Sequence, residues 1–192
     1  MKQHRLTGIL LLAMLVLMTT LCGCESREKY TETIHERIHE NFLDIKSYIA
    51  KCTITVHSQK DHVYDVKMSY DKDNETFKMA YDDINIVLQS DSAKITKGGV
   101  SLKTRSSDSY MPMFVNSFFR YYYAGEESSI NVSKVKNFGT TTLEAALSDN
   151  DSNASMQKIW IDNKTALPVK SEIYKTDGNI YMEIVFKSFE FK

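Results

Sequence analysis

The sequence contains little cysteine, proline or glycine, and each scarcity excludes a class of structure. Three cysteines and two prolines among 192 residues are too few for a disulfide-stapled miniprotein or a proline-rich linker. Seven glycines exclude a collagen-like chain, and no internal repeat is visible. The folded part of the chain must therefore be stabilised by an ordinary hydrophobic core.

The chain also lacks any run of like charge. Its 24 basic and 25 acidic residues give a formal charge of −1 and are spread along the whole length. Proteins that bind nucleic acid concentrate basic residues on one face, because the phosphate backbone dominates their affinity. We therefore expect no nucleic-acid partner.

One long apolar run stands near the N-terminus. Ile9 to Met18 is unbroken but shorter than the roughly 20 residues that cross a bilayer, and Lys2 and Arg5 precede it. This pattern predicts a signal peptide rather than a transmembrane helix. The predicted signal peptide ends within Leu21-Cys22-Gly23-Cys24, which resembles a bacterial lipobox. A lipobox is the site where a signal peptide is cut before a cysteine that carries lipid.

The lipobox predicts the layout of the mature protein. Residues 1–23 form a lipoprotein signal peptide, residues 24–29 a lipidated tether attached through Cys24, and residues 30–192 a single domain. That domain is expected to be extracytoplasmic and lipid-anchored to a bacterial membrane. An ordinary secretory signal followed by an incidental cysteine is the alternative.

Removal of residues 1–23 leaves 169 residues with a formal charge of −3, since the removed segment carries two basic residues. A chain of this length is ample for one domain with a core and short for two. Because Cys22 leaves with the signal and Cys24 carries lipid, Cys52 stands alone and no internal disulfide is expected.

Hydrophobic periodicity predicts one helix followed by many strands. From about Tyr30, apolar residues recur at three- and four-residue spacing, as in an amphipathic helix with one buried stripe: Ile34, Ile38, Phe42 and Ile45. At Tyr48 the period changes to two, which is typical of a half-buried strand. Polar turns then divide residues 58–99 into short alternating runs that favour an antiparallel meander.

A second helix is predicted at residues 109–123, where it interrupts the meander. Ser109 is a capping residue, Pro112 stands early and Gly125 follows the end. Its apolar and aromatic residues lie on nearly every side, so we expect an enclosed helix that plugs the concavity of a curved sheet. The alternative is that its aromatic residues line a lipid pocket or contact a partner.

Strands resume in the last third of the sequence. Alternating runs cover three segments: 130–138, 141–147 and 156–161. Pro168 opens a further strand, and Asp177-Gly178 is a strong hairpin signal. The final run, 181–191, suits a strand packed on both faces for part of its length. Together these segments predict a mainly β (α+β) fold.

One catalytic motif occurs in the first predicted helix. His35-Glu36-Arg37-Ile38-His39 matches H-E-x-x-H, in which two histidines one turn apart bind zinc and the glutamate acts as base. Phe42 and Ile45 occupy the glycine and histidine positions of the metzincin extension, so that extension is absent. The buried stripe also leaves both histidines on a flank, and we therefore expect no metal site.

Other candidate chemistry is weaker still. Cys52 with His57 or His62 could form a nucleophile and its base, but Cys52 falls on the apolar face of a strand, where an inert thiol is expected. Four carboxylates stand in turns, where aspartate serves local hydrogen bonding: Asp71, Asp73, Asp82 and Asp83. No phosphate-binding glycine loop or G-x-S-x-G motif occurs. We therefore expect no enzyme, no catalytic residue and no cofactor.

The C-terminal third carries a resemblance to a known family. The segments Ile159-Trp160-Ile161-Asp162, Ala166 to Tyr174, Asp177-Gly178 and Phe186 to Phe191 resemble the C-terminal signature of the LolA-like lipoprotein-carrier superfamily. The resemblance implies an open antiparallel β-barrel or half-barrel, with an N-terminal helix and an apolar helix enclosed on its concave face. The soluble carriers bear no lipobox, so a shuttle between two membranes does not fit this chain.

The chain as a whole is similar to the anchored, spore-germination members of this superfamily. That similarity implies a lipoprotein of the forespore envelope or intermembrane space. It also implies a partner, a zinc-dependent N-acetylmuramoyl-L-alanine amidase of the CwlD type, which the chain would bind and activate in cortex peptidoglycan modification. No partner-binding residue can be transferred by motif. A lipid or lipoprotein carrier is the alternative, and an open apolar cavity of roughly 300 to 1,000 Å³ would favour it.

An open barrel leaves two strand edges with unpaired backbone groups. Such edges invite pairing with a second copy unless charge or cover protects them. We therefore expect a homodimer formed by edge pairing or strand exchange, with the polar loops 106–109 and 148–153 as hinges.

Overall fold

The computed structural model of the chain describes residues 34–89, 92–105, 108–124, 139–147 and 154–192. The predicted signal peptide, the tether and Cys24 lie outside these residues, as do the predicted strand 130–138 and the loop 148–153. The chain divides into two compact units, Met1–His39 and Glu40–Lys192. Every described strand belongs to the second unit, which therefore carries a hydrophobic core of its own.

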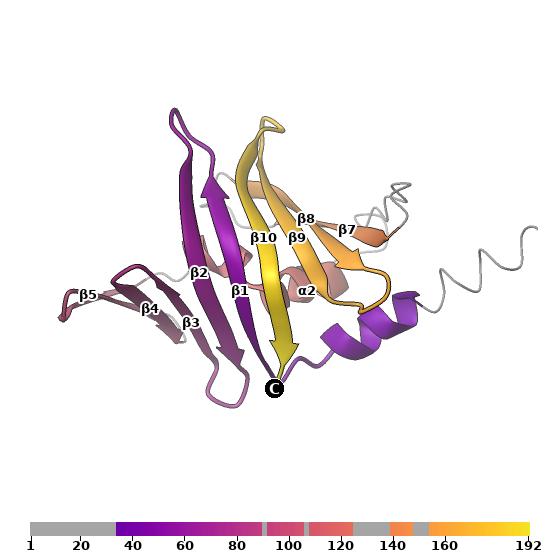
Figure 1. Cartoon of the computed structure of the whole chain (residues 1–192), viewed down its shortest axis with the longest axis horizontal. Helices are drawn as coiled ribbons and strands as arrows, with labels where there is room; N and C mark the ends of the chain where they lie inside the picture. The colour runs from indigo at the N-terminus through magenta and orange to yellow at the C-terminus, as the bar shows by residue number, and fades with distance from the viewer. Residues whose placement is uncertain (1–33, 90–91, 106–107, 125–138, 148–153) are drawn as a thin grey trace, which may run out of the picture. The chain divides into compact units, whose positions relative to one another are not determined.

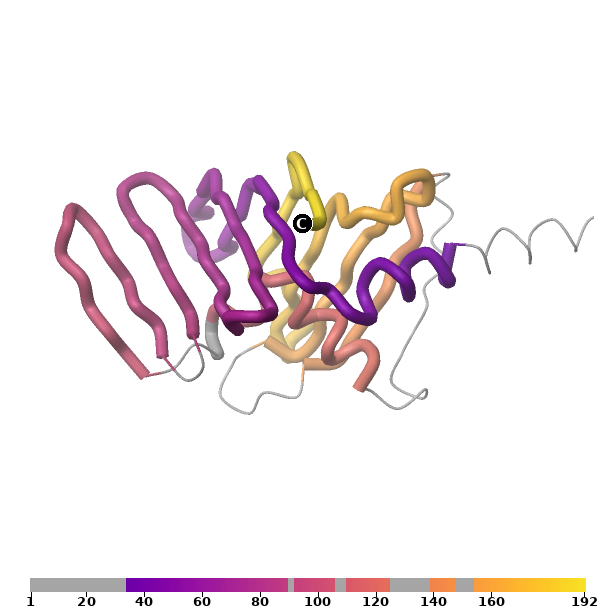
Figure 2. The backbone as a smooth tube through the Cα atoms, turned by 90° about the horizontal axis from the view of Figure 1, so that it is seen from below, coloured from indigo at the N-terminus to yellow at the C-terminus, as the bar shows by residue number. Residues whose placement is uncertain are grey.

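Within the described residues, ten antiparallel strands form one sheet in the order β6-β5-β4-β3-β2-β1-β10-β9-β8-β7 (Figure 1). The first meander consists of β1 (Ser47–Val56), β2 (His62–Asp71), β3 (Thr76–Tyr81), β4 (Ile84–Gln89), β5 (Ser92–Lys97) and β6 (Val100–Arg105). The second consists of β7 (Thr140–Ala146), β8 (Ala154–Asp162), β9 (Pro168–Lys175) and β10 (Ile180–Phe191). Pairing of β1 with β10 joins the two meanders, so the first and last strands lie side by side at the centre (Figure 2).

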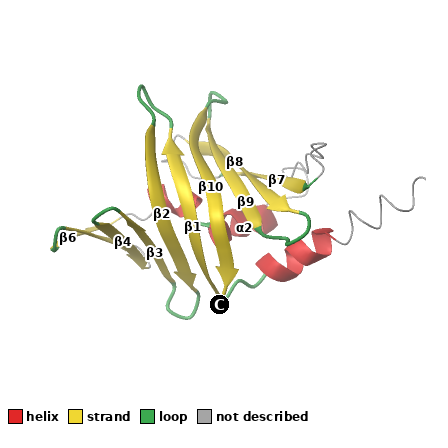
Figure 3. Ribbon diagram, viewed as in Figure 1, coloured by secondary structure: helices red, strands yellow, loops and turns green. Residues whose placement is uncertain are grey.

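The helices complete a mainly β fold. Residues 34–42 are helical, and all four residues of the predicted stripe, Ile34, Ile38, Phe42 and Ile45, are buried. Between the meanders the chain forms a 3-10 helix, η1 (Asp108–Met113), and then α2 (Val115–Ala124), which lies on one face of the sheet (Figure 3). The predicted open antiparallel sheet with helices is confirmed.

The prediction of a single helix at 109–123 is wrong, because two helices, η1 and α2, cover this segment and meet at Phe114. In a continuous helix the Val115 N–H would donate to the Met111 carbonyl. Instead, Met111 accepts from the Phe114 N–H at 3.0 Å, and Val115 donates to the Tyr48 hydroxyl at 3.2 Å. The hydrogen bond from Val115 to Tyr48 of the sheet therefore replaces the helical bond to Met111, and α2 begins as a separate helix at Val115.

Helix α2 is enclosed on the side that meets the sheet. Val115, Ser117, Phe118 and Phe119 are buried, whereas Arg120 is exposed and the following three tyrosines are half-buried. The expected plug is thus present, with one polar side.

Strand β10 contains a bulge that the sequence did not predict. Lys51 pairs with Ser188 and Cys52 pairs with Phe186, so Lys187 is one residue in excess. A bulge shifts the phase of the inward-facing residues. Even-numbered Ile184 and odd-numbered Phe189 are therefore both buried on the same face.

Two polar side chains attach the helices to the sheet inside an apolar core. The Tyr48 hydroxyl accepts from Val115 and donates to Asn116 Oδ1 at 3.3 Å, and its ring stacks on Phe189 with centroids 4.8 Å apart. Burial raises the pKa of the Tyr48 phenol, so the hydroxyl keeps the proton that it donates. On β8, Gln157 Nε2 donates to the Pro112 carbonyl at 2.9 Å.

Replacement of Tyr48 by phenylalanine tests this attachment. Tyr48→Phe leaves the ring packing intact but deprives the buried Val115 N–H of its acceptor, so we expect the free energy of unfolding to fall by about 1–3 kcal/mol. Urea denaturation followed by circular dichroism measures the change. Tyr64→Phe is the matched control, because Tyr64 is half-buried on β2. Equal losses in the two variants would show that the Tyr48 hydroxyl does not anchor α2.

Candidate functional site

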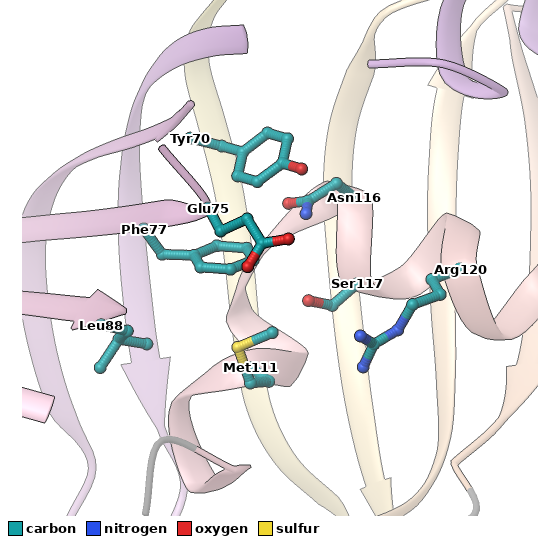
Figure 4. A pocket seen from close by; sticks show the side chains of 8 residues that line it. All are labelled: Tyr70, Glu75, Phe77, Leu88, Met111, Asn116, Ser117 and Arg120. Atoms are coloured by element: carbon teal, nitrogen blue, oxygen red, sulfur yellow. The ribbon is translucent and has the colours of Figure 1, made fainter. Parts of the chain in front are cut away.

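A pocket of about 270 Å³ lies between the first meander and the helices (Figure 4). Strands β2 to β4 and the turn between β2 and β3 supply one wall, and η1 and α2 supply the other. Its lining residues are Tyr70, Glu75, Phe77, Leu88, Met111, Asn116, Ser117 and Arg120.

The sheet register aligns the strand side of the pocket. Tyr70, Phe77 and Leu88 are direct neighbours across β2, β3 and β4, so their side chains share one face. Glu75 precedes β3 in a left-handed conformation, with φ at 46°, and its N–H donates to the Lys72 carbonyl. This turn brings a carboxylate beside an apolar floor (Figure 4).

The helix side of the pocket contributes polar groups. Ser117 is buried, and its hydroxyl has no hydrogen-bond partner among the described residues. Arg120 is exposed, stacks over the Tyr121 ring at 5.5 Å and forms no ion pair with a described carboxylate. The pocket therefore combines a guanidinium, a carboxylate and a hydroxyl with an apolar floor.

The size and lining of this pocket limit what it can bind. Its volume lies just below the range of about 300–1,000 Å³ that is usual for small-molecule sites. It suits one inserted side chain better than an acyl chain, because charged groups stand on both walls. Sequence reasoning missed Glu75, Ser117 and Arg120, since a turn and a helix that are far apart in the chain supply them.

The H-E-x-x-H residues lie on the helix formed by residues 34–42. His35 is half-buried and Glu36 and His39 are exposed. Within the part of the chain that the structure describes, no cluster of three or more potential metal ligands occurs. Those described residues therefore supply no third zinc ligand beside His35 and His39.

Cys52 and its candidate bases are separate. The Cys52 thiol is buried and lies 3.5 Å from the Met68 sulfur. His57 instead pairs with Asp61 at 3.2 Å, and His62 stacks on the Tyr64 ring. The structure brings no base to the thiol from among these residues.

The turn aspartates behave as predicted where contacts are described. Asp71 accepts hydrogen bonds from the Asp73 and Asn74 N–H groups, and the side-chain hydrogen bond from Asn74 contributes most to lowering the pKa of the Asp71 carboxyl. Asp82 adopts a left-handed conformation in the β3–β4 turn. The Asp71 carboxylate therefore serves local turn geometry.

The proposed lipid site, Cys24, lies outside the described residues. Among the helices that are described, none has the length and apolar content needed to span a membrane.

Burial raises the pKa of the Cys52 thiol to about 12, and two smaller effects accompany it: the charge of Lys187 lowers the pKa and that of Asp65 raises it. We therefore expect Cys52 to resist iodoacetamide at pH 8 in the folded, unlipidated chain and to react fully in urea, which mass spectrometry would measure. Rapid alkylation of the folded chain would contradict the assignment of an inert core thiol.

Comparison with known proteins places this fold. No curated protein matches the chain. Among solved structures, the chain is similar to a chain in the structure of the Clostridioides difficile CwlD amidase in complex with the GerS lipoprotein. The TM-score is 0.50 and the sequence identity is 20%, with 84% of this chain and 95% of that chain covered.

Two further structures are similar at lower scores. A LolA superfamily protein from Nitrosomonas europaea gives a TM-score of 0.46 and 12% identity, with 84% of this chain and 93% of that chain covered. The lipoprotein LppX from Mycobacterium tuberculosis gives a TM-score of 0.46 and 10% identity, with 82% of this chain and 93% of that chain covered. At such identities the likeness concerns the fold alone. A match to a sequence family is more specific than a likeness in fold. Residues 4–192 match the model of the YdcC-like sporulation proteins, and the chain belongs to that family.

Proposed function

We propose that this chain is a membrane-anchored sporulation lipoprotein that binds and activates a zinc-dependent cell-wall amidase of the CwlD type in cortex peptidoglycan modification. Membership of a sporulation family supports the process. The fold it shares with a structure that contains GerS and CwlD supports the class of partner. The amide-bond chemistry belongs to the amidase, and this chain acts through its surfaces.

The filled face of the sheet is the observation that carries this proposal. Phe114, Phe118 and Phe119 are at most 1% exposed, and the Phe119 ring stacks on Phe42 with centroids 4.1 Å apart. Aromatic packing of this kind occupies the space that a carrier would reserve for acyl chains. The pocket lined by Glu75 and Arg120 is small and charged, so a side chain of a protein partner fits it better than a lipid does.

The pocket and the adjoining side of α2 form the best contact surface for the amidase. Binding energy at protein interfaces concentrates in a few anchors that fill pockets, and arginine and tyrosine are frequent among them. Arg120 is exposed at the pocket, and Tyr121 and Tyr122 are half-buried beside it. One side chain of the partner would enter the pocket, with Arg120 and Glu75 at its rim.

The remaining parts of the proposal concern anchoring and assembly. Residues 1–23 are removed as a signal peptide, residue 24 carries lipid, and residues 30–192 form one domain in the forespore envelope or intermembrane space. Strand β6 supports assembly through an edge, because all six of its residues are exposed and it ends the sheet. A homodimer would form there by edge pairing or strand exchange.

Activation can be tested directly with purified proteins. We expect the mature chain, residues 25–192, to raise the rate of a CwlD-type amidase on muropeptides and to co-elute with it in light scattering. Arg120→Ala should weaken the complex by about tenfold, because it removes an exposed anchor. Lys60→Ala, in the β1–β2 turn, is the control and should leave affinity unchanged.

The same samples separate the proposal from the carrier alternative. A chain that neither shifts the amidase's mass nor changes its rate, yet takes up a fluorescent fatty acid, would reverse the assignment. Uptake would then require a larger cavity than this pocket.

Lipid attachment is tested by substitution at the lipobox. Because Cys24 is not part of Glu40–Lys192, the unit that carries the sheet and its core, Cys24→Ala should abolish labelling by a radioactive fatty acid while the circular dichroism spectrum stays unchanged. Labelling that persists in the variant would identify Cys22 or another residue as the acceptor.

A further inference from the structure

Basic residues gather on the sheet face that points away from α2. Phe77 and Leu88 line the pocket, so the alternate residues of β3 and β4 point to the opposite face. Following the register from β1 to β6, that opposite face carries six exposed cations, which we call the basic face: Lys51, Lys67, Lys78, Lys94, Lys103 and Arg105.

The charge of the basic face is largely uncompensated. None of its six cations forms an ion pair within the part of the chain that the structure describes. Within β1 to β6, two carboxylates share the face, and both are engaged: Asp65 pairs with Lys187, and Asp71 accepts hydrogen bonds within its turn. The net positive charge is thus available to an outside partner, although the chain as a whole has a formal charge of −1.

Two lysine pairs on this face oppose each other directly. Lys51 pairs with Lys67 across β1 and β2, and Lys94 pairs with Lys103 across β5 and β6. Like charges at directly opposed positions destabilise a sheet. Arrangements that cost stability without a local benefit tend to mark functional surfaces.

We propose that the basic face binds the anionic phospholipid surface of the membrane to which the chain is anchored. This inference rests on the proposed lipid anchor, which would hold the domain beside that surface. Five of the six cations are lysines, whose compact charges suit a diffuse layer of lipid phosphates, whereas arginine is preferred for bidentate contacts with a protein carboxylate. The outward-facing residues of β1 to β6 include no aromatic side chain, which a protein hot spot would favour.

Docking of this face would orient the domain. The sheet would lie between the membrane and α2, because the pocket and Arg120 are on its other side. The amidase contact would then point away from the lipid, and the membrane would set the direction in which the partner is held.

Vesicle sedimentation with the unlipidated mature chain, residues 25–192, tests this orientation without the anchor. That chain contains the whole of Glu40–Lys192, the unit that carries the sheet and its core. We expect binding to phosphatidylglycerol-containing vesicles, no binding to pure phosphatidylcholine, and loss of binding as salt is raised, because screening weakens exposed charge interactions.

A charge-swapped variant makes the test specific. Lys51→Glu with Lys103→Glu converts both opposed pairs into Glu–Lys pairs, so the thermal midpoint should rise while vesicle affinity falls about 30-fold or more. Lys60→Glu with Lys97→Glu changes the net charge equally, but Lys60 lies in a turn and Lys97 opposes Ile84 on the pocket side. This control should retain affinity within about threefold, because it leaves the basic face intact.

Three outcomes would overturn the proposal. These are equal sedimentation with neutral and anionic vesicles, unchanged affinity of the swapped variant, and an equal loss in the control. If the chain ignores anionic vesicles and the swapped variant loses the amidase instead, the basic face is a protein interface and the membrane assignment is wrong. Arg120→Ala tests the amidase contact independently, so the two proposals can fail separately.

Discussion

The hydrogen bonds of the buried Tyr48 hydroxyl are the constraint on which the helical face depends. A phenol in the first strand replaces the carbonyl that would continue η1 into α2, and it thereby fixes where α2 begins. The position of α2 then decides which aromatic residues fill the concave face and where Ser117 and Arg120 stand. A single polar group in an apolar core can specify an arrangement in this way because leaving its partners unsatisfied is costly.

The two faces of the sheet have different chemistry, and the difference follows from strand periodicity. Alternate residues of β1 to β4 supply an aromatic and aliphatic face on the side of the helices, while the intervening residues of β1 to β6 supply the basic face. The proposed functions divide in the same way, with the amidase on the helical face and anionic lipid on the other. In this proposal the chain would hold the amidase at a defined orientation, and the amidase would supply the catalytic groups.

Several features followed from the sequence alone, because each depends on residues close together in the chain. The buried stripe of residues 34 to 45, the alternation that starts at Tyr48 and the hairpin at Asp177-Gly178 are local patterns, and all are present. Pro168 opens β9 as expected, since proline lacks the N–H that a strand interior needs. Local patterns of this kind were therefore sufficient to predict the mainly β fold, whereas the family followed from the resemblance of the C-terminal segments.

Other features depend on contacts between distant residues, and only the tertiary structure decided them. The break at Phe114 needs Tyr48, the bulge at Lys187 needs the register of β10 against β1, and the pocket needs a turn and a helix that are separate in sequence. The sequence suggested evenly spread charge, yet pairing of strands places Lys94 opposite Lys103 and gathers single lysines into one face. Local periodicity determines which side of a strand a residue occupies, whereas register alone determines which residues become its neighbours.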